Sequence, residues 1–209
     1  MLPPRYYDRL SATTSTRGGN LPHWSQACAT FVTFRLNDSL PAEKLSLYES
    51  ELKEFMATHP EPWDESTQME YYERFPRRLQ SWLDAGYGAC LLADPALRVI
   101  VEESLRHFAD VRYSLYAFVV MPNHVHVLFM PHEGVDGREV VATWKRYTAR
   151  AINAARGARG EVWQKESYDR LVRDVEEFNG IRAYIRGNNP TLAFDAYEAG
   201  ATTASSAMV

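Results

Sequence analysis

Alternating apolar and polar positions mark three stretches of this chain as β-strands. They are residues 29–36, 113–120 and 124–129. Apolar positions three or four residues apart, with proline, serine or aspartate near the start, predict helices. These helices cover residues 39–58, 66–84, 94–108, 138–155 and 174 to about 186, and Pro76 should kink the second of them. Strands interleaved with helices in this way predict an α+β domain with helices packed on a sheet.

The two ends of the chain differ in composition from its middle. Residues 1–20 contain Pro3, Pro4 and a run rich in Ser, Thr and Gly, which predicts a flexible arm. Residues 196–209 are small and polar, which predicts a disordered tail. We therefore expect a single domain over residues 21–195.

The composition is that of an ordinary globular protein. With 209 residues, 45% of them hydrophobic and 24% charged, the chain can bury one sizeable core. Cys28 and Cys90 suggest neither a disulfide framework nor a zinc ribbon, and no apolar run approaches a membrane span of about 20 residues. A cytoplasmic protein with no membrane partner fits these features.

The net charge of −4 hides an uneven distribution. Residues 38–73 hold ten acidic side chains against two lysines, whereas residues 138–173 hold nine basic side chains against four acidic ones. A partner that meets only one surface responds to such local charge more than to the sum. The pattern is compatible with an anionic partner, although two ordinary solvated helix faces would also produce it.

Two histidines in the third predicted strand are the first candidates for chemistry. Residues 121–123 should form a turn, so that residues 113–120 and 124–129 make an antiparallel hairpin. Side chains alternate faces along a strand, so His124 and His126 point the same way while Val125 and Val127 point toward a core. Two imidazoles on one face can bind one metal ion, and the alternative is a pair of polar residues on a solvated face.

The segment Val119–His126 resembles the His-hydrophobic-His motif of the HUH endonucleases, and most closely that of the small single-tyrosine transposases, including the group associated with repetitive extragenic palindromes (REP). The resemblance covers about residues 20–192. Each further matching segment is weakly specific alone, but their order is specific. They are Leu21–Trp24, Phe31–Leu36, Trp144-Lys145, Trp163–Glu166 and Tyr184-Ile185.

This resemblance implies a ferredoxin-like antiparallel sheet with packed helices, and a site with assigned roles. His124, His126 and Asn188 would bind a divalent metal, Mg²⁺ or Mn²⁺, and Tyr184 would attack a phosphodiester of single-stranded DNA. In the family, proline directly follows the asparagine, whereas here Asn189 intervenes. Asn189 is therefore an alternative third ligand, and Gly187 could end the helix before either asparagine.

The helical projection is compatible with Tyr184 as the nucleophile. Phe178, Ile181 and Ile185 form an apolar stripe, and Tyr184 falls at its edge. The chain contains twelve tyrosines, and two others remain as alternative nucleophiles, Tyr168 and Tyr147.

Five basic residues are expected to contact DNA phosphates and to supply salt-sensitive affinity. They are Lys145, Arg146, Arg150, Lys165 and Arg173. Trp163 and Tyr168 could stack on unpaired bases, whereas Trp144 and Tyr147 are expected in the core. The expected partner is single-stranded or hairpin DNA, and the chain would act as a monomer or a homodimer.

Two other functions compete with a metal-dependent strand transferase. A domesticated relative would bind hairpin DNA without cutting it, and the altered segment around Asn189 leaves that open. A histidine-triad nucleotide hydrolase also has alternating histidines on a strand. That class needs a third histidine at the position of Leu128, so it is the weaker alternative.

Overall fold

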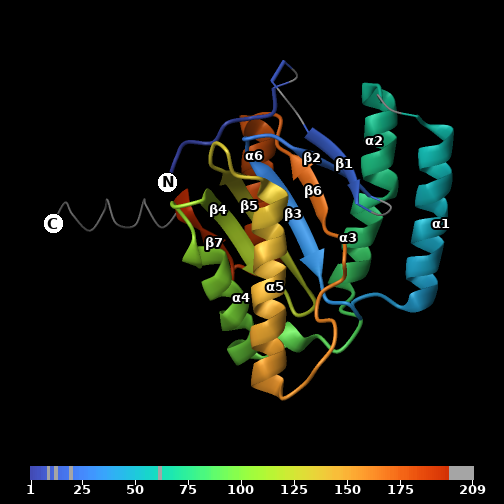
Figure 1. Cartoon of the computed structure of the whole chain (residues 1–209). Helices are drawn as coiled ribbons and strands as arrows, with labels where there is room; N and C mark the ends of the chain where they lie inside the picture. Colours follow the sequence, from blue (N-terminus) through green and yellow to red (C-terminus); the bar gives the residue numbers. More distant parts are fainter. Residues whose placement is uncertain (9, 12–13, 19–20, 61–62, 198–209) are drawn as a thin grey trace.

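A five-stranded antiparallel sheet forms the centre of the computed structural model, which describes residues 1–8, 10–11, 14–18, 21–60 and 63–197 (Figure 1). The strand order is β6-β3-β5-β4-β7. The strands are β3 (Thr30–Arg35), β4 (Tyr113–Val120), β5 (His124–Pro131), β6 (Tyr168–Leu171) and β7 (Phe194–Asp195). The tail expected at residues 196–209 lies outside the described residues from position 198 onward.

The connections between the strands have the ferredoxin-like pattern that the resemblance implies. Apart from the insertion at residues 36–94, β3 is followed in chain order by α4 (Pro95–His107), the hairpin β4–β5, α5 (Gly137–Arg156) and β6. Counted within this unit, the first and third strands are central, and all neighbours are antiparallel. The α+β class and the predicted hairpin are therefore confirmed.

The two faces of the sheet carry different helices. Val125, Val127 and Phe129 point into a core that is closed by α4 and α5, which lie side by side in front of the sheet in Figure 1. The alternate residues of β5 point to the opposite face, which α6 (Val175–Asn188) covers. The histidines lie on this second face, as the alternation predicts.

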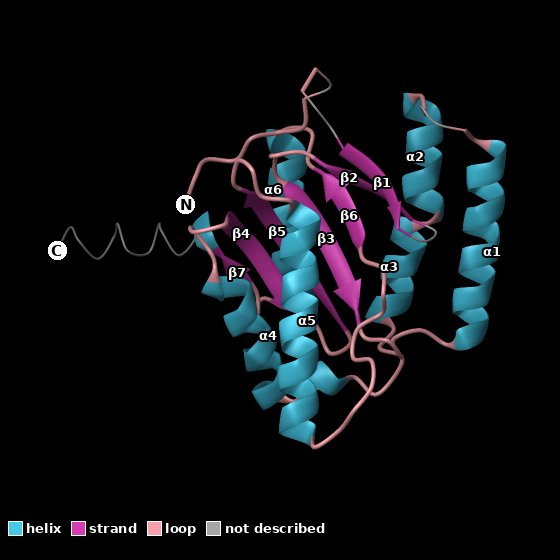
Figure 2. Cartoon of the chain, in the orientation of Figure 1, coloured by secondary structure: helices cyan, strands magenta, loops and turns pink. Residues whose placement is uncertain are grey.

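Three helices between β3 and η1 (Leu91–Ala93) form a separate packing unit, which we call the inserted helices. They are α1 (Ala42–Thr58), α2 (Glu65–Arg74) and α3 (Pro76–Asp84), and they share a core of their own that includes Tyr48 and Phe75. Figure 2 shows them standing beside the sheet. Pro76, predicted to kink one helix over residues 66–84, instead begins a separate helix, so α2 ends before it.

The two ends of the inserted helices meet at one place. Ala89 N donates to Asp38 Oδ2 (2.7 Å). Gly88 has φ +87°, and a Cβ there would collide with the Asp38 carbonyl, so glycine is required. The chain thus leaves the sheet and returns to it at the same point.

The N-terminal segment contains regular structure that its composition did not predict. Residues 14–18 form β1 (Thr14–Gly18), which pairs with β2 (Leu21–Ser25). Residues 1–8 run along the sheet: Tyr7 N donates to Val172 O (2.8 Å), and Ala29 N donates to Arg5 O (2.7 Å). Serine, threonine and glycine signal turns, but here long-range backbone pairing decides the structure.

Two aromatic residues lie where the sequence interpretation did not place them. Tyr147 is 53% exposed, so its expected core position is wrong; the buried stripe of α5 instead includes Trp144 and Thr148. Trp163 is only 6% exposed and donates from Nε1 to Thr148 Oγ1 (2.8 Å), so it is not available to stack on bases. The core position expected for Trp144 is confirmed. No helix in the described ranges is long and apolar enough to span a membrane.

Candidate active site

A tight turn between β4 and β5 brings the two histidines to the start of a buried strand. Met121 N donates to His124 O (2.9 Å), which closes the turn through Pro122 and Asn123. His124 and His126 are 1% and 0% exposed, and their Nε2 atoms lie 3.0 Å apart.

The side chain of Asn123 determines the tautomer of His124. Its Nδ2 group donates to the carbonyl oxygens of Leu83 and Tyr87, both at 3.1 Å, which fixes the orientation of the amide. Oδ1 therefore faces the imidazole and accepts the proton of His124 Nδ1 (2.7 Å). With the proton on Nδ1, the lone pair of His124 Nε2 is directed at His126.

The second imidazole is held by β3. Thr33 Oγ1 lies 2.8 Å from His126 Nδ1, and the ring of Phe31 stacks against the imidazole at a centroid distance of 5.5 Å. Burial lowers the pKa of His124 to about 4 and the pKa of His126 well below its usual value, where the neighbouring His124 acts in the same direction. Both rings are therefore neutral at pH 7, which is the form that binds metals.

The spacing of the two nitrogens fits adjacent positions around one ion. Ligand atoms about 2.1 Å from an octahedral ion and about 90° apart are about 3.0 Å from each other, as the two Nε2 atoms are. Within the described residues no His, Cys, Asp or Glu completes a group of three that could hold a metal. An amide oxygen would have to supply the next protein ligand.

Sequence reasoning missed two polar side chains that α3 brings close to the histidines. Gln80 Nε2 lies 3.0 Å from His126 Nε2 and donates to Asp84 Oδ1 (3.1 Å). Asp84 Oδ1 is 3.8 Å from His124 Nε2, and burial raises the pKa of this carboxyl. The two residues are one helical turn apart, but nothing local in the sequence indicates that α3 reaches the hairpin.

Helix α6 places Tyr184 beside the histidine pair. Its Oη lies 3.3 Å from His126 Nε2, and its ring meets the edge of Phe31 at a centroid distance of 6.2 Å. Phe178 and Ile185 are buried, and Tyr184 is 37% exposed at the edge of this stripe. Burial raises the pKa of Tyr184 to about 12, so the phenol keeps its proton at pH 7.

The helix continues through Gly187, so Asn188 lies one turn after Tyr184. Asn188 Nδ2 donates to Tyr184 O (2.9 Å), and a hydrogen bond from the same side chain opposes the rise in the tyrosine pKa. Asn189 Oδ1 accepts from the backbone of Thr191 (3.2 Å) and so closes the following turn. The amide that lies against a histidine Nε2 atom is that of Gln80.

The two alternative tyrosines occupy different surroundings. Tyr147 is exposed on α5, the helix that packs against the opposite face of the sheet. Tyr168 lies on β6, paired with Thr33, and burial raises its pKa well above the usual value. Of the three candidates, Tyr184 is the one whose hydroxyl contacts a histidine.

The basic residues expected to bind DNA form one group with an outlier. Lys145 Nζ donates to Lys165 O (2.7 Å), and Arg146 and Arg150 are exposed on the same helix. Burial, together with nearby positive charge, lowers the pKa of Lys145 to about 8. Arg173 follows the other end of β6 and pairs with Glu177 on α6 (3.3 Å), so the structure does not bring it to this group.

Part of the chain is similar in sequence to a known protein family, and two solved structures resemble it. Residues 94–188 match the family of IS200-like transposases. One similar solved structure is a REP-associated tyrosine transposase bound to a REP hairpin, with 16% identity over 78% of this chain and 67% of that chain, and a TM-score of 0.39. Another is a candidate transposase from Deinococcus radiodurans R1, with 15% identity over 83% of this chain and 97% of that chain, and a TM-score of 0.37. No curated protein matches the sequence. The part of the chain that carries the histidine pair and Tyr184 is therefore similar to the IS200-like transposases.

Proposed function

We propose that this protein is a metal-dependent strand transferase that cuts and rejoins single-stranded DNA through Tyr184. The observation that carries the proposal is the contact between Tyr184 Oη and His126 Nε2 (3.3 Å), beside a second neutral imidazole. A nucleophile and a candidate metal pair meet on one face of the sheet although they come from β5 and α6.

The donor set fits a divalent ion such as Mg²⁺ or Mn²⁺. His124 Nε2 and His126 Nε2 would hold it, and an amide oxygen of Asn188 or Gln80 would complete the protein ligands. A bound ion would draw electron density from a nonbridging phosphate oxygen and stabilise the charge of the transition state. Asn123 Oδ1 accepts from His124 Nδ1 and so keeps the Nε2 lone pair of that ring available, and Thr33 Oγ1 lies 2.8 Å from His126 Nδ1.

The proposed reaction is a transesterification that needs no nucleotide cofactor. The Tyr184 oxygen forms a bond to phosphorus while the bond from phosphorus to the 3′ oxygen breaks. The phenol loses one proton and the departing 3′ oxygen gains one, so the step is balanced. The phosphotyrosine linkage conserves the ester bond, and a 3′ hydroxyl of another strand can reverse the step and join new ends.

The group around Lys145 is the proposed contact for the DNA backbone. Lys145 and Lys165 meet at the end of β3, and Arg146 and Arg150 extend the positive surface along α5. Phosphate neutralisation by these side chains would give a salt-dependent affinity. Single-stranded DNA with a hairpin is the substrate class to test first.

The test is cleavage of labelled hairpin DNA with a single-stranded flank in Mn²⁺. The wild type should cut the flank, whereas the variant His124→Ala/His126→Ala should bind the same DNA without cutting it. A matched control is His107→Ala, because His107 lies on α4 against the other face of the sheet. Undiminished cleavage by the double variant would refute the assignment. Tight binding without any cleavage by the wild type would instead favour a non-catalytic DNA-binding protein.

A further inference from the structure

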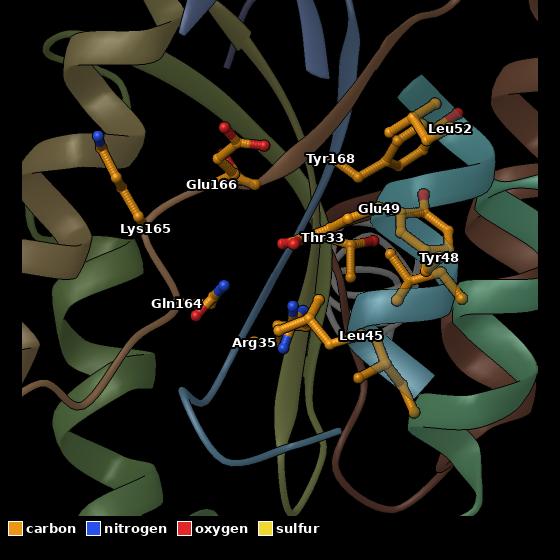
Figure 3. Close-up of a pocket in the computed structure, with 13 residues that line it drawn as sticks. Thr33, Arg35, Leu45, Tyr48, Glu49, Leu52, Gln164, Lys165, Glu166 and Tyr168 are labelled. Carbon is orange, nitrogen blue, oxygen red and sulfur yellow. The ribbon is translucent and has the colours of Figure 1, made fainter. Parts of the chain in front are cut away.

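A cavity of about 200 Å³ lies in the seam between the inserted helices and the sheet (Figure 3). Its floor is the end of β3, with Thr33 and Arg35, and one wall is α1, with Leu45 and Tyr48. The opposite wall is the segment 164–168, which leads into β6. In Figure 3 the side chains from these elements surround the open space from both sides.

One buried polar group in this cavity lacks the partner that burial normally requires. Tyr48 is 5% exposed, and its hydroxyl has no hydrogen-bond partner. Arg35 is 8% exposed, and its Nη1 donates to Ser39 Oγ (3.2 Å). An unsatisfied buried polar group is destabilising, so its retention needs an explanation. A ligand that occupies the cavity would give the Tyr48 hydroxyl a partner.

The remaining surface of the cavity suits a flat ring. Leu45 and Leu52 of α1 and Leu79 and Leu83 of α3 supply apolar walls. The volume is below the roughly 300–1,000 Å³ of pockets that hold drug-sized ligands. Glu49 and Glu166 add carboxylate acceptors, and Gln164 and Lys165 add further polar groups. Apolar walls with donors and two carboxylates match a nucleobase better than a phosphate, which the carboxylates would repel.

The cavity adjoins the candidate active site through a shared residue. Thr33 lines the cavity, and its hydroxyl lies 2.8 Å from His126 Nδ1. Leu79 and Leu83 line the cavity from α3, the helix that also carries Gln80 and Asp84 to the histidines. A base in this cavity would therefore belong to a nucleotide close to the reacting phosphate.

We propose that this cavity binds one unpaired guanine of the DNA strand that Tyr184 cuts, an inference that rests on the proposed function. Guanine offers two adjacent acceptors, O6 and N7, which match the paired donors of a guanidinium such as that of Arg35. Its N1–H and N2–H groups would face the carboxylate of Glu49, and its ring would lie between the leucines. The Tyr48 hydroxyl would gain the hydrogen bond that it lacks.

Binding alone tests the inference, without metal and without cleavage. The probes are a fluorescent oligothymidylate of about 20 nucleotides and three versions with a single central dG, dA or dC, compared by anisotropy in EDTA. The dG strand should bind at least about 5-fold more tightly than the other three, as one bidentate contact allows. Replacing dG with 7-deaza-dG, which lacks the N7 acceptor, should remove most of this preference. Equal affinities for all four strands, or no binding of any, would overturn the proposal.

Variants of the cavity residues then test which side chains produce the preference for dG. Tyr48→Phe should weaken binding of the dG strand about 2–10-fold, the value of one hydrogen bond, without lowering the melting temperature, because the hydroxyl has no partner to lose. Arg35→Lys should make dG and 7-deaza-dG strands bind equally, since lysine cannot form the bidentate contact. Tyr116→Phe is the matched control: its hydroxyl donates to Leu2 O (3.1 Å) far from the cavity, so base preference should stay unchanged.

A dG preference that persists in both Tyr48→Phe and Arg35→Lys would place guanine elsewhere and overturn the proposal. If Arg35→Lys fails to fold, the comparison of dG with 7-deaza-dG in the wild type still tests whether the protein recognises the N7 acceptor of guanine. These results are independent of Tyr184 chemistry. If the protein cuts DNA without base preference, the proposed function stands and the guanine site is refuted. If it prefers guanine but does not cut, the guanine site stands and the proposed function is refuted.

Discussion

Replacing Asn123 with alanine tests how the turn prepares the candidate metal pair. The side chain is 1% exposed and makes three hydrogen bonds, two from Nδ2 to the carbonyls of Leu83 and Tyr87 and one accepted by Oδ1 from His124. Alanine leaves two buried carbonyls and one buried N–H group without these partners. The proton of His124 is then free to move to Nε2, where it blocks that lone pair.

The expected magnitudes follow from these three bonds. At about 0.5–1.5 kcal/mol each, their loss should cost about 3 kcal/mol of unfolding free energy. For a chain of this size that corresponds to a drop of about 6–12 °C in melting temperature. Loss of the group that orients a metal-binding imidazole should weaken Mn²⁺ binding about 10–100-fold.

Thermal unfolding without metal and calorimetric titration with Mn²⁺ measure the two effects separately. Asn153→Ala is the matched control, because Asn153 makes one exposed hydrogen bond from Nδ2 to Gly160 O (2.8 Å). It should lose no more than about 1 kcal/mol and bind Mn²⁺ like the wild type. A folded Asn123→Ala variant with unchanged Mn²⁺ affinity would refute the role of Asn123 in orienting His124.

Two further outcomes follow from the surroundings of the site. The pKa of Lys145 is lowered to about 8, so this cation is lost as the pH rises from 7 to 9, and DNA affinity should fall over that range. Lys145→Arg stays charged and should remove this part of the pH dependence in anisotropy titrations; an identical decline in both proteins would contradict the assignment. Asp84→Asn should weaken Mn²⁺ binding about 10-fold, because it removes the carboxylate 3.8 Å from His124 Nε2. Calorimetry that gives equal Mn²⁺ affinities for the wild type and Asp84→Asn would exclude this contribution.

Periodicity predicted the parts of the fold that local sequence determines. The hairpin, the shared face of His124 and His126, and the helix with Tyr184 at the edge of its apolar stripe all follow from alternation or helical spacing. The break at Pro76 follows from proline chemistry. The stripe on α5 was misjudged at Tyr147, because a helix with aromatic residues on adjacent sides has more than one plausible buried face.

The groups that surround the histidines depend on tertiary structure. Asparagine at position 123 predicts a turn. Its role in orienting His124 arises because its side chain donates to the carbonyls of Leu83 and Tyr87. Gln80 reaches His126 across 46 positions of sequence. No local pattern encodes such contacts, since they arise from the way the inserted helices return to the sheet. The cavity beside Arg35 has the same origin.

The most direct test of the central claim is the identity of the residue that becomes linked to DNA. The wild type, incubated with Mn²⁺ and hairpin DNA that has a single-stranded flank, should form an adduct that resists denaturant. Peptide mass mapping should place the 5′ phosphate on Tyr184. Tyr184→Phe keeps the ring on Phe31 and loses a hydroxyl contact of 3.3 Å, so folding and binding should persist while the adduct disappears. An adduct on Tyr168 or Tyr147, or full cleavage by Tyr184→Phe, would contradict the account.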